Sequence, residues 1–303
     1  MTATFFEYHI KSTTQFYAIP THLLIRSNYL KFHFMKPNIA RYYQNFRALL
    51  DAISAGSGYY NLGWAEKGVR STFNQAQEQL VKIVMDRLKI KPDMSVLDCG
   101  CGLGGPMRYI SSRAQANVFG MEFLSSQVDA GKLVGAYSRD NMRLSRGDAN
   151  DMPFAASSFD RIYSIESAFH YRDKAQFVRE SARTLKSDGI LAVADIVVKD
   201  GKNSGDGYRR FRQSLASPEL FTPYAYRESA MISGFKTCEV IDLSPGVMAS
   251  VQKMGSDMFK HPSKYRSTGY PLIYLYFIMF TSLFIRYFYR WFPIRYQLFL
   301  MTK

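Results

Sequence analysis

Four glycines follow a short apolar segment in the run VLDCGCGLGGPMR, which extends from Val96 to Arg108. The glycines are Gly100, Gly102, Gly104 and Gly105. The apolar segment is typical of a buried strand, and the glycines predict a tight turn into a helix. Because glycine has no Cβ atom, such a turn can adopt positive φ angles and let a nucleotide approach the main chain. The run therefore predicts a nucleotide-binding turn.

The acid before this turn, Asp98, indicates which nucleotide binds there. Three of the glycines also satisfy the G-x-G-x-x-G spacing of dinucleotide-binding turns. A carboxylate in the same crevice would repel a pyrophosphate, however, and it would attract a ligand that carries an ammonium and a sulfonium group. We therefore expect S-adenosylmethionine (SAM) as the cofactor, rather than a nicotinamide dinucleotide.

Further polar residues follow the next strands that the sequence predicts, where ligands bind in open α/β sheets. Glu122 is expected to accept hydrogen bonds from both ribose hydroxyls of the cofactor. Asp148 is expected to accept one from the adenine amino group, while the backbone N–H of Ala149 faces the ring. Ile165 and Glu166 are expected to border the cofactor.

Two residues beyond these strands could assist methyl transfer. The leaving group is a neutral thioether, so the reaction needs alignment and, for a hydroxyl acceptor, removal of a proton. His170 is the expected base, with Asp195 orienting its ring, although packing roles for both stay open. An alkene acceptor would instead need a carboxylate such as Glu166 and electron-rich faces. The aromatic candidates for these faces are Tyr59, Tyr60, Trp64, Phe169 and Tyr171.

Strand-like and helix-like segments alternate from about residue 76, a pattern typical of a parallel sheet covered by helices. The expected strands are Ser95–Asp98, Asn117–Met121, Met142–Ser145, Arg161–Ile165, Gly189–Asp195, Phe235–Asp242 and Tyr296–Thr302. The expected helices are Gln75–Leu88, Pro106–Arg113, Ser125–Tyr137, Lys174–Leu185 and Tyr224–Ser233. We therefore expect an α/β fold of the Rossmann-like kind.

Four regions are expected along the chain. Residues 1–75 form a basic, aromatic and helical N-terminal segment with a lid, and residues 76–245 form the cofactor-binding core. Residues 246–295 form an aromatic insertion, and residues 296–303 add a final strand to the core sheet. The insertion contains YPLIYLYFIMFTSLFI, 16 residues without a charge, at Tyr270–Ile285. This run could pack on the domain or the acceptor pocket, lie in a membrane interface, or span a membrane.

The positive charge of the chain is concentrated at its two ends. The net charge of the chain is +14. Residues 1–50 contain six Lys/Arg residues and one acidic residue, and residues 251–303 contain eight Lys/Arg residues and one acidic residue. Basic residues beside aromatic and apolar ones favour an anionic membrane face over a nucleic-acid groove, although a solvated basic rim remains open. The first residues show no secretory signal pattern, the three cysteines form no metal or redox pair, and no metal site is expected. These features favour a cytoplasmic protein, and a peripheral location at a membrane stays open.

Several motifs resemble those of class I SAM-dependent methyltransferases: VLDCGCGLGGPMR, GDANDMPF, SSFDRIYSIESAFH and ARTLKSDGILAVADI. The GGPMR form and the preceding YYNLGW segment, Tyr59–Trp64, are most similar to sterol C24-methyltransferases. ESAFH also resembles O-methyltransferases that act on sugars and macrolides. LKSDG departs from the commoner LKPGG of the family, but it removes no group that the chemistry needs.

The resemblance implies a seven-stranded sheet with helices on both faces. It also implies that SAM is held by residues of the motifs, namely Asp98, Gly100, Gly102, Glu122, Asp148 and Glu166, and that Gln127 contacts its methionine part.

Two functions stay open at this point. One is methyl transfer to a bulky hydrophobic acceptor, such as a sterol, prenyl compound, quinol or lipid, at a membrane surface. The other is an O- or N-methyltransferase for a polar metabolite, with the aromatic insertion in a homodimer interface. A nucleic-acid methyltransferase is disfavoured, because IESA stands where an NPPY-like tetrapeptide would be.

Overall fold

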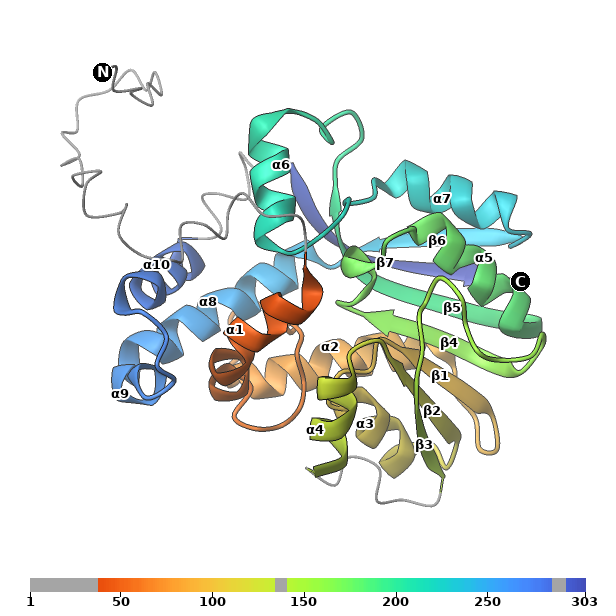
Figure 1. Ribbon diagram of the computed structural model, residues 1–303, viewed down its shortest axis with the longest axis horizontal. Helices are drawn as coiled ribbons and strands as arrows, with labels where there is room; N and C mark the ends of the chain where they lie inside the picture. Colours follow the sequence, from red (N-terminus) through yellow and green to blue (C-terminus); the bar gives the residue numbers. More distant parts are fainter. Residues whose placement is uncertain (1–37, 134–140, 285–292) are drawn as a thin grey trace. The chain divides into compact units, whose positions relative to one another are not determined.

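Seven strands form one sheet in a computed structural model of the chain, which describes residues 38–133, 141–284 and 293–303. The strands are β1 (Ser95–Cys99), β2 (Asn117–Glu122), β3 (Met142–Arg146), β4 (Phe159–Ile165), β5 (Leu185–Val198), β6 (Thr237–Asp242) and β7 (Ile294–Thr302). They are hydrogen-bonded in the order β3-β2-β1-β4-β5-β7-β6 (Figure 1). Neighbours from β3 to β5 are parallel, whereas β7 is antiparallel to both β5 and β6. The predicted α/β fold with a seven-stranded, mostly parallel sheet is confirmed.

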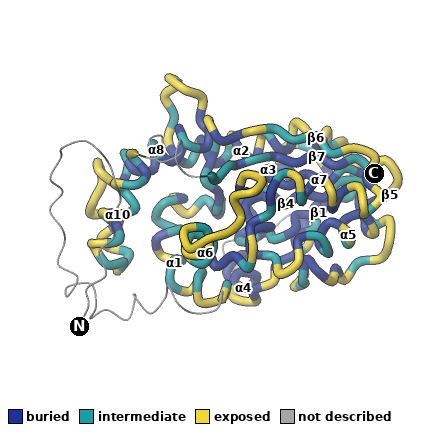
Figure 2. Tube along the Cα trace, turned by 90° about the horizontal axis from the view of Figure 1, so that it is seen from above, coloured by how far each residue is buried: buried dark blue, intermediate teal, exposed yellow. Residues whose placement is uncertain are grey.

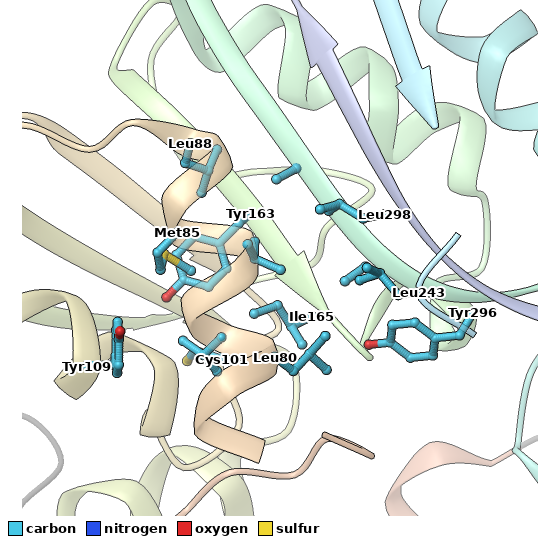
Figure 3. Packing of buried hydrophobic residues seen from close by; sticks show 14 of the residues in the cluster. Leu80, Met85, Leu88, Cys101, Tyr109, Tyr163, Ile165, Leu243, Tyr296 and Leu298 are labelled. Atoms are coloured by element: carbon cyan, nitrogen blue, oxygen red, sulfur yellow. The ribbon is translucent and has the colours of Figure 1, made fainter. Parts of the chain in front are cut away.

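Helices cover both faces of this sheet. They are α1 (Ile39–Ile53), α2 (Phe73–Leu88), α3 (Gly105–Arg113), α4 (Ser125–Leu133), α5 (Lys174–Thr184), α6 (Gly205–Ser214), α7 (Pro223–Ile232), α8 (Ser244–Lys260), α9 (Pro262–Arg266) and α10 (Leu272–Leu283). Alternate strand residues point to opposite faces. In β1, Val96 therefore joins the cluster that contains Leu80 of α2, and Leu97 joins the cluster that contains Phe177 of α5. Figure 3 shows part of the first cluster, with Leu80, Met85 and Leu88 of α2 beside Tyr163 and Ile165 of β4.

Local signals in the sequence explain where the helices of the core begin. Thr72 and Gln75 form a reciprocal capping box at the start of α2, and Asp173 caps α5 by accepting the Gln176 N–H at 2.8 Å. The predicted elements match the observed ones within a few residues, except that β5 is longer. Helix α6 was not predicted, and the part of the predicted helix Ser125–Tyr137 beyond Leu133 lies outside the described residues.

The insertion between β6 and β7 contains α8, α9 and α10. Helix α10 packs on α8, where Gly255 leaves room for Ser282 and the Gln252 amide donates to the Leu283 carbonyl at 3.1 Å. The uncharged run that begins at Tyr270 is thus a helix of 12 residues within its described part, and Ile285 lies outside that part. Among the residues that the structure describes, no helix is long and apolar enough to cross a membrane.

Candidate active site

A pocket opens at the carboxyl ends of β1, β2 and β4, where ligands bind in open α/β sheets. Its space, including the open solvent at its mouth, is about 570 Å³. The turn after β1, the ends of β2 and β4 and the segment of residues 58–61 line it, together with the first turns of α1. The pocket therefore brings the predicted glycine turn together with the N-terminal region.

The glycine turn has the geometry that the sequence predicts. Gly100 and Gly102 have φ angles of +78° and +51°, in the left-handed region that side chains with a Cβ rarely adopt. A Cβ on Gly100 would also lie 1.8 Å from the Ser167 Oγ atom, so a side chain does not fit there. The Gly102 N–H donates to the Glu122 Oε2 atom at 3.0 Å, which ties the turn to the end of β2.

Three buried carboxyl groups line this pocket: Asp98, Glu122 and Glu166. Burial, the largest cause, raises the pKa of Asp98 to about 8, and the negative charge of Glu122 raises it further. Burial also raises the pKa of Glu166 to about 8 and raises that of Glu122. Carboxylates gathered out of water are costly unless a cation or hydrogen-bond donors accompany them. The pocket is therefore suited to a positively charged ligand.

Several buried polar atoms in the pocket wall have no hydrogen-bond partner in the protein. They are Asn61 Nδ2, Asp98 Oδ2, Gln127 Oε1 and His170 Nδ1. Buried polar atoms are normally paired, so a cluster of unpaired ones around one pocket indicates a polar ligand. SAM fits this donor and acceptor set, because it carries an ammonium group, a sulfonium group and ribose hydroxyls. In the described residues, no group of His, Cys, Asp and Glu side chains could hold a metal ion.

Most predicted cofactor residues line the pocket, but two do not. Glu122 accepts the N–H groups of Gly102 and Leu124, each at 3.0 Å and each on a different oxygen, so both oxygens retain acceptor capacity. Ile165 and Gln127 line the pocket as well. Asp148 and its neighbour Ala149 lie outside the lining residues, and Asp148 accepts the Asn150 N–H at 2.8 Å. Their contact with adenine stays a prediction.

His170 lies at the end of a 3₁₀ turn, Ala168–His170, in an aromatic environment. Its Nε2 atom is 3.5 Å from the Tyr43 hydroxyl, and the rings of Tyr42 and Phe169 contact its imidazole. Burial lowers the pKa of His170 to about 3. The imidazole is therefore neutral at physiological pH, and its Nδ1 atom faces no protein partner.

The predicted pairing of Asp195 with His170 is wrong. Asp195 Oδ1 accepts the backbone N–H of Phe169 at 3.1 Å, and its Oδ2 accepts the Tyr226 hydroxyl at 2.6 Å. In the described part of the chain, no hydrogen bond joins Asp195 to the His170 ring. The reason is that Asp195 lies inside β5 and is fully buried beneath the turn, so that it holds the backbone before His170.

A buried lysine completes this support of the His170 turn. The Lys174 ammonium donates to the backbone carbonyls of Phe169 and Tyr171, each at 3.4 Å, and to that of Glu219. Burial lowers the pKa of Lys174 to about 8, whereas the nearby Asp195 opposes that shift. The sequence analysis missed Lys174, because a lysine at the first position of a helix carries no sign of being buried.

Only part of the expected set of aromatic residues lines the pocket. Tyr59 does not line it: the Tyr59 ring packs towards Gly105, while the neighbouring Tyr60 lines the pocket. Tyr43 of α1 lines it too, and the sequence analysis did not single it out. Only the contact between α1 and the 3₁₀ turn reveals Tyr43, since nothing in local spacing distinguishes it from Tyr42.

The segment around YYNLGW is fixed to the core at several points. The Leu62 N–H donates to Glu166 Oε1 at 2.6 Å, and the Gln77 amide donates to the carbonyls of Tyr59 and Asn61. Because Glu166 itself has a positive φ of +51° after β4, its carboxyl group faces this segment. The segment thus forms one wall of the pocket, while its predicted role as a lid stays a prediction.

Comparisons with known proteins agree with this geometry. A family described as "Methyltransferase domain" matches residues 97–193, which contain the glycine turn, Glu122 and Glu166. Methyltransferase GfsG of Streptomyces halstedii is 32% identical over 53% of this chain and 58% of its own length. A sterol 24-C-methyltransferase of Gibberella zeae is 31% identical over 52% of this chain and 46% of its own. The chain thus spans about half the length of these two relatives.

A solved structure shows the same fold. Phosphoethanolamine N-methyltransferase 2 of Haemonchus contortus, solved with S-adenosylhomocysteine, is 16% identical, and the match covers 86% of this chain and 58% of that one. The TM-score is 0.72. Residues 97–193 thus match a methyltransferase domain, and the strand order and the carboxylate-lined pocket of this chain agree with that match.

Proposed function

We propose that this methyltransferase transfers a methyl group from SAM to a hydrophobic small molecule of the sterol, prenyl, quinol or lipid class, at a membrane surface. The observation that carries this proposal is the mixed lining of the pocket. Asp98, Glu122 and Gln127 supply polar groups, whereas Ile39 and Tyr43 of α1 add apolar and aromatic surface to the same pocket. The likeness to a sterol methyltransferase supports an acceptor of this class.

The polar groups of the lining can bind and orient the donor. SAM supplies a methyl carbon bonded to a positively charged sulfur. Asp98 and Glu166 provide negative charge close to that positive charge, and the cation in turn favours their ionised forms. Glu122 and the backbone of the glycine turn hold polar groups of the nucleoside part. Alignment of this kind contributes roughly 7–11 kcal/mol to reactions between well-oriented partners.

The aromatic residues shield the acceptor from water. Tyr42, Tyr43 and Phe169 surround the His170 imidazole, which is neutral. For a hydroxyl acceptor, a neutral imidazole can accept the proton as the methyl group is transferred. For an alkene acceptor, the tyrosine rings provide the electron-rich faces that stabilise a cation.

Labelled-product analysis tests the proposal. The full chain is incubated with methyl-labelled SAM and either a total lipid extract or a water-soluble metabolite extract of one cell source, with Asp98→Asn as the inactive control. We expect label in a lipid-soluble product that the variant does not form. Label confined to water-soluble products would replace the proposal by the alternative, an O- or N-methyltransferase for a polar metabolite.

A further inference from the structure

One face of α10 exposes large apolar side chains to solvent, as the many exposed and half-buried positions of this helix in Figure 2 indicate. Six of them are between 41% and 64% exposed: Leu272, Ile273, Tyr276, Phe277, Phe280 and Phe284. At about 200 Å² for a large side chain, they expose on the order of 600 Å² of largely apolar surface. That area lies at the upper end of what monomeric proteins expose, and patches of this size usually mark an interaction site.

The exposed residues form a stripe, and the opposite side of α10 is packed. With a rotation of about 100° per residue, the six positions fall within an arc of roughly 140° on the helix. Leu275 and Ser282, on the other side, are buried against α8 and its neighbours. Among the residues that the structure describes, contacts within the chain thus bury only one side of α10 and leave the stripe exposed.

Cationic groups accompany the stripe, while α10 itself carries no charge. The Arg266 guanidinium donates to the Tyr276 hydroxyl at 3.1 Å, so a positive charge lies directly beside the exposed aromatic residues. Lys260 at the end of α8 is exposed, and Lys264 follows on α9. In residues 253–284, four basic residues accompany a single acid, Asp257. An uncharged aromatic surface beside cations complements an anionic lipid surface, in which apolar side chains enter the interface and cations meet headgroups.

This stripe is connected to the pocket through α1. Leu49 of α1 packs in one cluster with Met258, Tyr265 and Leu275, and the ring of Phe46 contacts that of Tyr270 at 5.4 Å. The same helix lines the pocket through Ile39 and Tyr43, one to two turns before these contacts. The helix that carries the stripe therefore packs, through its other side, against the helix that lines the pocket.

We propose that the α10 stripe and its basic neighbours dock this protein on an anionic lipid bilayer, from which the pocket receives a hydrophobic acceptor. The proposal rests on the proposed function for the identity of the acceptor, but the docking itself does not. A second copy of the chain is a less suitable occupant, because stripe-to-stripe contact would bring the cationic groups of two copies together.

Vesicle binding by the full-length protein tests the docking. The protein is sedimented with phosphatidylcholine vesicles that contain either no anionic lipid or 30% phosphatidylserine, a proportion of about a third chosen to give a negative surface. The test variant is Phe277→Ser/Phe280→Ser, whose side chains are 64% and 55% exposed. The matched control is Met231→Ser/Ile232→Ser on α7, whose side chains are 59% and 73% exposed.

We expect the wild type and the α7 control to bind the anionic vesicles, with release at high salt, and the α10 variant to bind at least tenfold more weakly. SAM binding should be equal in all three proteins, which shows that the α10 variant is folded. Absence of wild-type binding, or equal binding by the α10 variant, would overturn the docking proposal. So would a wild-type dimer that the α10 variant converts to a monomer without vesicle binding. Vesicle binding by a protein that never consumes SAM would instead refute the proposed function alone.

Discussion

The affinity for SAM should increase steeply with pH below 8. Burial raises the pKa of Asp98 to about 8, so in the free protein about 1% of this carboxyl group is ionised at pH 6 and about 9% at pH 7. A cationic ligand binds the ionised form, so binding at pH 6 must first release a proton. If only Asp98 ionises on binding, the affinity rises about ninefold from pH 6 to pH 7, or about 1.3 kcal/mol.

Calorimetry at pH 6.0, 6.5 and 7.0, in two buffers with different ionisation enthalpies, measures both the affinity and the protons released. The amino group of SAM stays largely protonated in this range, because α-amino groups have pKa values near 8. We expect about one proton to be released per SAM bound at pH 6.5. We also expect the affinity of Asp98→Asn for SAM to change less with pH than that of the wild type. Glu166→Gln tests whether the second carboxyl group, with its pKa also near 8, adds to the slope. An affinity that is equal at pH 6 and pH 7, without proton release, would refute this reasoning.

Three further predictions follow from the geometry of the pocket. Gly100→Ala should lower the free energy of unfolding by about 2–5 kcal/mol, because it places a side chain at a positive φ and against Ser167. Gly102→Ala should lower it by only about 1–2 kcal/mol, because the nearest atom to its Cβ would be 4.0 Å away. Urea unfolding without ligand compares the two variants, and an equal loss of stability would contradict the contact with Ser167. Since the folded pKa of His170 is about 3 and its unfolded pKa about 6.5, the unfolded chain binds the extra proton, and stability falls as the pH falls below 6.5. Relative to His170→Gln, the wild type should therefore lose about 2 kcal/mol between pH 7 and pH 5 in urea unfolding, and a constant difference would show that the imidazole is not buried as described. Tyr43→Ala should raise the KM for the acceptor at least tenfold with an unchanged Kd for SAM, while Tyr43→Phe should stay near the wild type; a weaker SAM Kd in Tyr43→Ala would place Tyr43 on the donor side instead.

The sheet and the cofactor side of the site could be predicted because their signals are local. Strand β1 is a run of apolar residues, and the turn after it needs glycines for a backbone reason that acts within a few residues. Glu122 follows from the same rule, since parallel strands place their carboxyl ends at one edge of the sheet. These features depend on position along the chain and on the alternation of buried residues.

The acceptor side could not be predicted in the same way, because it depends on contacts between distant segments. Tyr43 reaches His170 across 127 residues of sequence, and no periodicity encodes that meeting. Asp195 was expected to face the pocket because it stands near the end of β5, but the strand continues to Val198 and buries it. The sequence named both Tyr59 and Tyr60 as candidates, but it could not tell that only Tyr60 lines the pocket, because Gln77 of α2 holds this irregular segment through contacts made in the fold.

Hydrogen exchange of the full chain with and without SAM tests the central claim most directly. If the carboxylate-lined pocket holds the methyl donor, SAM should slow amide exchange in the turn of residues 100–105, at the end of β2 and in residues 58–62. Residues of β6, the edge strand that lies three positions from β4 in the sheet, should exchange at the same rate with and without SAM. Binding of SAM without protection of the glycine turn, or protection only outside these three segments, would contradict the account of the site.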